Sequence, residues 1–97
     1  MISKKQALIR LQGFKETNGS KYGIVSLGVF GSLARNQASE NSDVDVVVCV
    51  SKPDLFMLVG IKNELEERLH RPVDIVTYRE NMNQFLKKRI DGEAVYA

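Results

Sequence analysis

The sequence of 97 residues has a single cysteine, Cys49, and no apolar run near the roughly 20 residues that a membrane-spanning helix needs. One cysteine cannot form an intrachain disulfide, and such sparing use is typical of a reducing compartment, so we expect a cytoplasmic protein. No long apolar stretch follows the first lysines, so we expect neither a secretory signal nor a membrane partner. Repeats, low-complexity tracts and linkers are also missing, which predicts a single domain over residues 1–97.

Charge of both signs is present, but it is unevenly distributed along the chain. The net charge is +2 overall, with +4 over residues 1–23, −3 over 24–78 and +1 over 79–97. The acidic middle segment argues against a continuous nucleic-acid-binding face, so we expect no direct nucleic-acid partner. The same segment suits a cation site if several of its carboxylates converge.

The apolar residues alternate between helical and strand periods. Ser3 followed by Gln6 predicts a capping box and a helix that ends before the stop signal at 18–20. The predicted helices span about 4–17, 33–35, 54–69 and 82–90, with a turn at 91–92. The predicted strands span 24–30, 44–50 and 73–77, and 94–96 could add an edge strand. The order α-β-α-β-α-β-α predicts a layered α/β domain.

Two aspartates stand at the start of the valine-rich segment 44–50. Asp43 and Asp45 are two residues apart, so on a strand their side chains project from the same face. Such a pair repels unless a cation lies between the carboxylates, and paired carboxylates suit Mg²⁺. The simpler interpretation, that Ser42 and Asp43 cap a loop end, is the more frequent one for an isolated Asp-x-Asp.

Gly31 and Ser32 follow the first predicted strand, and ten residues separate Ser32 from Asp43. Glycine lets backbone N–H groups approach a phosphate closely, and Ser32 offers a hydroxyl to the same phosphate. Arg35, one helical turn later, adds a fixed positive charge and is a third candidate nucleotide-binding residue. A Gly-Ser pair by itself is usually no more than a turn.

Asp74 interrupts the third predicted strand, which is otherwise apolar. A carboxylate there is costly unless it is paired or bound to a metal, and a salt bridge to Arg71 or Arg79 is the simpler alternative. Together, a phosphate cradle after one strand and carboxylates on the next two provide the groups needed for two-metal displacement at phosphorus. His70, after the long helix, is expected to be structural, and Cys49, in the valine strand, is expected in the core.

Gly-Ser, ten residues, Asp-x-Asp and a further aspartate on the next strand resemble the minimal nucleotidyltransferases of the DNA polymerase β-like superfamily. The motifs at 31–35, 42–45 and 73–76 show no departure from that pattern, and the resemblance extends from about Ile24 to the C-terminus. It implies a nucleotidyltransferase fold of the α/β (α+β) class, with a mixed sheet of three to four strands flanked by helices.

The resemblance also implies a reaction, namely Mg²⁺-dependent transfer of a nucleoside monophosphate from ATP or another NTP to an acceptor hydroxyl. It places Gly31 and Ser32 at the triphosphate. It assigns Asp43, Asp45 and Asp74 as the catalytic, metal-binding carboxylates, with Asp74 available to deprotonate the acceptor.

The resemblance finally implies a partner. Stand-alone proteins of this size in the family are commonly antitoxins of small helical HEPN-type toxins, and some add AMP to a toxin tyrosine. We therefore expect a HEPN-type partner, with the acceptor site supplied by that partner or by a second copy in a homodimer. An antitoxin that neutralises its partner by contact alone, with an idle site, is the alternative hypothesis.

Overall fold

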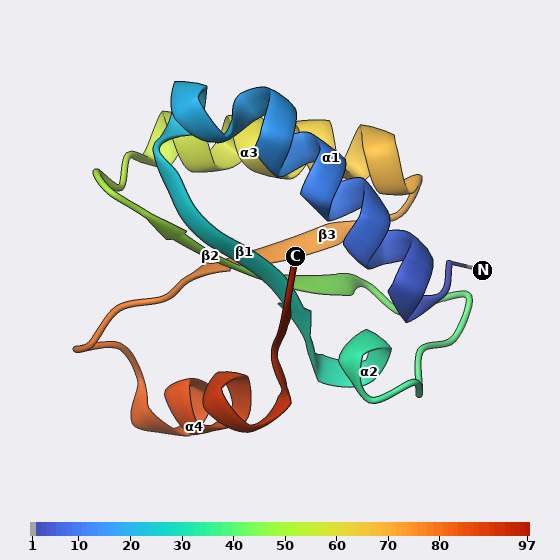
Figure 1. Cartoon of the computed structure of the whole chain (residues 1–97). Helices are drawn as coiled ribbons and strands as arrows, with labels where there is room; N and C mark the ends of the chain where they lie inside the picture. The colour runs from blue at the N-terminus through green and yellow to red at the C-terminus, as the bar shows by residue number, and fades with distance from the viewer. Residues whose placement is uncertain (1) are drawn as a thin grey trace.

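The computed structural model describes residues 2–97, which form four helices and four strands (Figure 1). The helices are α1 (Lys4–Tyr22), α2 (Gly31–Ala34), α3 (Leu55–Leu69) and α4 (Gln84–Glu93). The strands are β1 (Ile24–Phe30), β2 (Val44–Val50), β3 (Val73–Thr77) and β4 (Val95–Tyr96). The predicted alternation of helices and strands is confirmed, and the capping box at Ser3 and Gln6 is present.

The first helix is longer than predicted, because it continues through the stop signal at 18–20 and ends at Tyr22. The Tyr22 ring stacks on Phe14 with centroids 6.1 Å apart, and its hydroxyl donates to Glu64 of α3. These tertiary contacts stabilise the last turn beyond what local propensity predicts. Gly23 ends the helix in the left-handed region, at φ 63°, and its N–H donates to helix carbonyls.

The last helix is also displaced from its prediction. Asn83 caps its start by accepting a hydrogen bond from the Leu86 N–H, so the helix begins at Gln84 rather than at residue 82. The predicted turn at 91–92 is wrong, since the helix continues to Glu93. The Tyr78 hydroxyl donates to Asp91 over 2.8 Å, and this contact holds the final turn in place.

The four strands form one mixed sheet in the order β3-β2-β1-β4. β2 is antiparallel to β1 and parallel to β3, while β4 is antiparallel to β1. In this register Phe30, at the end of β1, faces Asp45, which in turn faces Asp74. The sheet therefore brings the three sequence motifs together, at the end of β1 and at the starts of β2 and β3.

Helices lie on both faces of the sheet. Figure 1 shows α1 and α3 on one face and α4 on the other, with α2 after the end of β1. Val44, Val46 and Val48 pack into the larger core with α1 and α3, and Val47 packs with Ile90 under α4. The valine strand is therefore buried on both faces, as its composition predicts. Cys49 was expected in the core, but it is only partly buried.

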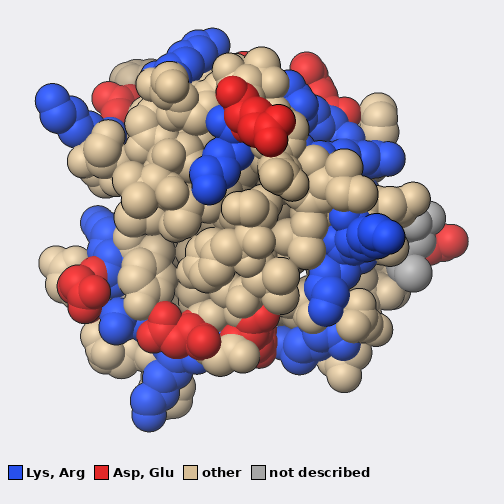
Figure 2. All heavy atoms as spheres, viewed as in Figure 1, with Lys and Arg blue, Asp and Glu red and all other residues tan. Residues whose placement is uncertain are grey.

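The surface carries charge of both signs. Figure 2 shows lysine and arginine side chains interspersed with acidic ones around this face, with uncharged atoms in its middle. Within residues 2–97, every helix is too short or too polar to cross a membrane.

Candidate functional site

Asp45 and Asp74 lie side by side at the start of the two parallel strands β2 and β3. Their Cα atoms are register partners, and partners on neighbouring strands project their side chains to the same face. Asp43 immediately precedes β2, two residues before Asp45. The carboxylates are neighbours on the sheet, yet no three His, Cys, Asp or Glu side chains of the described chain form a ready-made metal centre.

Asp74 differs from the expectation in its exposure. The sequence argument assumed a carboxylate within a buried strand, but β3 is an edge strand and the Asp74 side chain is exposed. The premise that burial makes this charge costly is therefore wrong. The alternative pairing is not seen either, because Arg71 donates to backbone carbonyls and Arg79 is exposed without a carboxylate partner among the described ion pairs.

Asp45 is the carboxylate of this group with the most perturbed surroundings. Burial raises its pKa most, the neighbouring Asp74 raises it further, and Asp43 adds a smaller effect. The guanidinium groups of Arg89 and Arg35 partly offset this rise. Asp45 is thus close to two other carboxylates, which repel its charge, and to two arginines, which stabilise it.

Gly31 is packed directly against Asp45. Its φ is +72°, in the left-handed region, and an added Cβ would lie 3.1 Å from Asp45 Cγ and would overlap Asp45 Oδ2. Both the backbone conformation and the contact therefore require glycine. The Gly-Ser pair is more than an ordinary turn, because it lets the end of β1 close onto the acidic start of β2.

Glu93, the last residue of α4, joins this cluster without any signal in the sequence. The Gly31 N–H donates to its Oε2 over 2.9 Å, and Arg35 Nη1 lies 2.8 Å from its Oε1. Arg89 Nη2 lies 3.8 Å from Oε2. Burial raises the pKa of Glu93, but the Gly31 hydrogen bond and the Arg35 guanidinium outweigh that effect and hold the pKa below its usual range.

The two remaining candidate nucleotide-binding residues stand on and after α2. Ser32 is partly buried, and its carbonyl accepts a hydrogen bond from the Gln37 N–H. Arg35 follows α2, and its Nε also donates to the Gln37 side chain over 3.1 Å. Gly31, Arg35 and Asp45 are therefore brought together, while the assignment of Gly31, Ser32 and Arg35 to a nucleotide stays a prediction.

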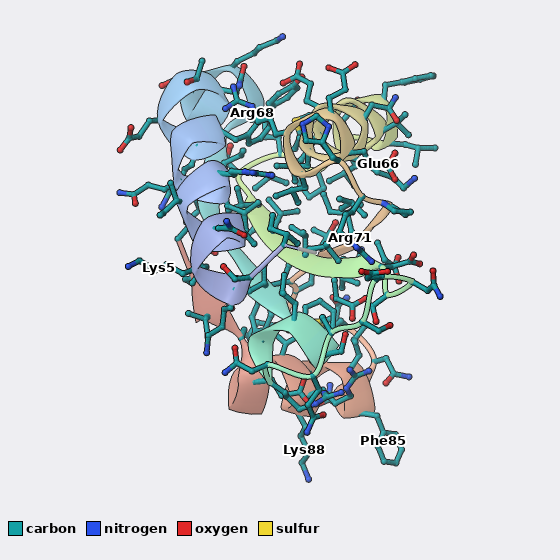
Figure 3. All side chains as sticks on the ribbon, turned by 90° about the vertical axis from the view of Figure 1, so that its right-hand side faces the viewer. Lys5, Glu66, Arg68, Arg71, Phe85 and Lys88 are labelled. Carbon is teal, nitrogen blue, oxygen red and sulfur yellow. The ribbon has the colours of Figure 1, made fainter. Side chains whose placement is uncertain are left out.

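Arg71 is a second residue whose role the sequence does not indicate. Its guanidinium donates to the carbonyls of Ser39 over 3.0 Å and of Ser42 over 2.5–3.2 Å, and also to that of Glu40. Figure 3 shows Arg71 directed at this loop, which leads into β2. Because Asp43 follows Ser42 in the chain, Arg71 fixes the backbone that carries the first carboxylate.

A cavity of about 300 Å³ lies elsewhere, where α1 meets the end of α3. It is lined by Arg10, His70 and Arg71 among others and contains none of the predicted site residues. His70 ends α3 in the left-handed region, with φ 56°, and its backbone N–H donates to the Glu66 carbonyl. Its position matches the structural role expected of it.

Comparison with known proteins identifies relatives of this arrangement. Residues 14–97 match the family described as polymerase beta, nucleotidyltransferase. The protein adenylyltransferase MntA of Thermococcus cleftensis is 32% identical over 97 residues, covering 99% of this chain and 97% of the relative. A Methanocaldococcus jannaschii protein assigned as a protein adenylyltransferase is 43% identical over 76 residues, 77% of this chain and 81% of the relative.

Solved structures share the fold. A minimal nucleotidyltransferase superposes with a TM-score of 0.71 at 32% identity, covering 91% of this chain and 93% of that one. A chain of a toxin–antitoxin crystal structure with AMP-PNP superposes with a TM-score of 0.76 at 19% identity, covering 91% and 69% of the two chains. At that lower identity the likeness establishes the fold alone.

Proposed function

Because the chain belongs to the polymerase β nucleotidyltransferase family, we propose that it transfers AMP from ATP to a hydroxyl group of a partner protein. The observation that carries this proposal is the close packing of Gly31 on Asp45, with Asp74 in register beside it. A relative that aligns over almost its whole length is named a protein adenylyltransferase, which supports AMP and a protein acceptor.

In this proposal each motif has a separate task. The Gly31 N–H and the Ser32 hydroxyl bind the triphosphate, and Arg35 neutralises part of its charge. The acceptor oxygen attacks the α-phosphorus, the bond from that phosphorus to the bridging oxygen breaks, and pyrophosphate leaves. The exposed Asp74 is within reach of solvent and of a docked partner, and we assign it to accept the proton of the acceptor hydroxyl.

The carboxylates also fit a divalent cation by their chemistry. Asp43, Asp45 and Asp74 supply hard oxygen ligands. Burial raises the pKa of Asp45 most, and the charges of Asp74 and Asp43 raise it further, a repulsion that a cation would relieve. We propose that these three residues hold Mg²⁺. When bound, the metal would supply positive charge against the negative charge that develops during transfer.

We propose that the partner is a small helical toxin of the HEPN class and that the acceptor is a tyrosine. Solved structures with this fold include toxin–antitoxin complexes. In-line attack needs the acceptor oxygen at roughly 3–3.5 Å from the α-phosphorus, and docking of a folded partner can hold it there. The excess of positive charge over residues 1–23 can steer an acidic partner. We place the reaction in the cytoplasm, which suits the one free cysteine.

Intact-mass spectrometry of a HEPN-type protein encoded beside this one tests the proposal. After incubation with this protein, Mg²⁺ and ATP, the partner should gain one or more units of about 329 Da, the mass of an added AMP moiety in a nucleotidyl transfer. The Asp43→Ala and Asp45→Ala variants should abolish the gain, whereas Glu16→Ala, an exposed charge on α1, should leave it intact. A partner that is inhibited yet never changes mass with any NTP would support the contact-only antitoxin instead.

A further inference from the structure

The carboxylate of Glu93 occupies the groups that the proposed function assigns to the triphosphate. One oxygen accepts the Gly31 N–H over 2.9 Å, and the other lies 2.8 Å from Arg35 Nη1. A backbone N–H and a guanidinium that converge on two oxygens of one carboxylate form an oxyanion site. The bound Glu93 carboxylate thus shows that the Gly31 N–H and Arg35 together can bind negatively charged oxygen atoms.

A phosphate group and Glu93 cannot both accept the Gly31 N–H. The Gly31 N–H has a single hydrogen to donate, and its distance of 2.9 Å shows a full hydrogen bond to Glu93. Arg35 Nη1 also lies 2.8 Å from Glu93, but the guanidinium carries further N–H groups and the side chain is 41% exposed, so the competition is for the Gly31 N–H. A triphosphate that binds here therefore replaces the carboxylate, and the two negative groups would repel each other if both stayed close.

We infer that Glu93 belongs to the nucleotide site, where its carboxylate holds the phosphate position in the free protein and sets the affinity for the triphosphate that displaces it. This inference rests on the proposed function. It deepens that proposal by naming a residue, 62 positions from Gly31 in the chain, that competes with the substrate.

The surroundings of Glu93 allow its side chain to leave without loss of the fold. It is the last residue of α4, and its side chain is 21% exposed. The helix is held independently by Ile90, which is fully buried under the sheet, and by the hydrogen bond from Tyr78 to Asp91. Arg89, whose Nη2 lies 3.8 Å from Glu93, can accompany the displaced carboxylate or turn to the incoming phosphates.

Calorimetric titration of the full chain with Mg²⁺-ATP, and separately with Mg²⁺-tripolyphosphate, tests the inference. Removal of the competing charge in Glu93→Gln should tighten binding of both probes by about tenfold, which is about 1.4 kcal/mol. Glu93→Ala should tighten it at least as much, because no side-chain acceptor remains. The matched control is Glu80→Gln, which removes the same charge from a side chain 91% exposed and paired only with Lys87, and should leave the affinity unchanged.

The outcomes separate this inference from the proposed function. If the wild type binds both probes and the Glu93 variants, with intact melting transitions, bind them equally or more weakly, Glu93 is a supporting residue and the inference is wrong. If Glu80→Gln tightens binding as much as Glu93→Gln, the effect is general electrostatics and the inference is again wrong. If neither the wild type nor any folded variant binds either probe, the nucleotide site itself is wrongly assigned, and the proposed function falls with it.

Discussion

Replacement of Gly31 by alanine probes the contact on which the candidate site depends. Alanine at φ +72° costs about 1–2 kcal/mol, because a left-handed backbone brings Cβ close to the carbonyl oxygen. The added methyl also overlaps Asp45 Oδ2, and displacing a packed side chain costs about 1–3 kcal/mol. The lower conformational entropy of the unfolded alanine chain returns about 0.4–1 kcal/mol. We expect Gly31→Ala to lose about 3 kcal/mol of unfolding free energy.

Urea unfolding followed by circular dichroism measures this loss. With an m-value of about 1.5 kcal/mol/M, the midpoint should fall by about 2 M. Gly13→Ala is the matched control, because a Cβ there meets only Arg68 Nη1 at 3.8 Å and lies inside α1. That control should gain about 0.5–1 kcal/mol, since alanine is the better helix former.

A double-mutant cycle separates the two contributions to the cost. In an Asp45→Ala background the overlap disappears, and Gly31→Ala should then cost only its backbone share, about 1 kcal/mol after the unfolded-state gain. An equal loss in both backgrounds would refute the packing of Gly31 on Asp45. A Gly31→Ala protein as stable as the wild type would refute the backbone argument as well.

Three further changes have defined outcomes. Arg71→Ala removes the hydrogen bonds to three loop carbonyls, so the Ser42 amide should exchange with solvent about tenfold faster, as measured by NMR. An unchanged exchange rate would show that Arg71 does not hold this loop in place. A backbone N–H bond lowers the pKa of Glu66, so its stabilisation is present above the usual value of 4.5 and is lost as pH falls through the lowered pKa. Glu66→Gln should flatten the acid limb of the pH–stability curve, and curves of identical slope below pH 4.5 would contradict this. Asp45→Asn should melt at a higher temperature than the wild type without metal, because a half-buried charge beside Asp74 is removed, and a lower metal-free melting temperature would contradict the repulsion between these carboxylates. Mg²⁺-ATP should raise the melting temperature of the wild type but not that of Asp45→Asn.

The strands, and the convergence of the three motifs at one end of the sheet, could be predicted from the sequence, because the local sequence signals of the strands agree with the fold. The β-branched runs at 24–30, 44–50 and 73–77 are bounded by polar breaks, and all three strands form with those bounds. The helix ends could not be predicted, because Tyr22 and Asp91 are held by tertiary contacts that outweigh the local stop signals.

The parts of the site that were missed depend on which elements pack together. Glu93 reaches Gly31 across 62 residues, and Arg71 reaches Ser42 across 29, so neither contact leaves a spacing signal in the chain. The exposure of Asp74 follows from the position of β3 at the edge of the sheet, which the strand's own apolar composition does not reveal. The residues of the motifs could be recognised in the sequence. The residues that contact them from distant parts of the chain, Glu93 and Arg71, become apparent only once the fold is known.

Transfer of label from ATP to the partner protein tests the central claim most directly. Two parallel reactions contain this protein, Mg²⁺ and the proposed HEPN-type partner, one with ATP labelled at the α-phosphorus and one with ATP labelled at the γ-phosphorus. The α-label should become covalently attached to the partner, while the γ-label should be released as pyrophosphate, because nucleotidyl transfer breaks the bond between the α- and β-phosphates. Attachment of the γ-label, or of neither label, would contradict a protein adenylyltransferase.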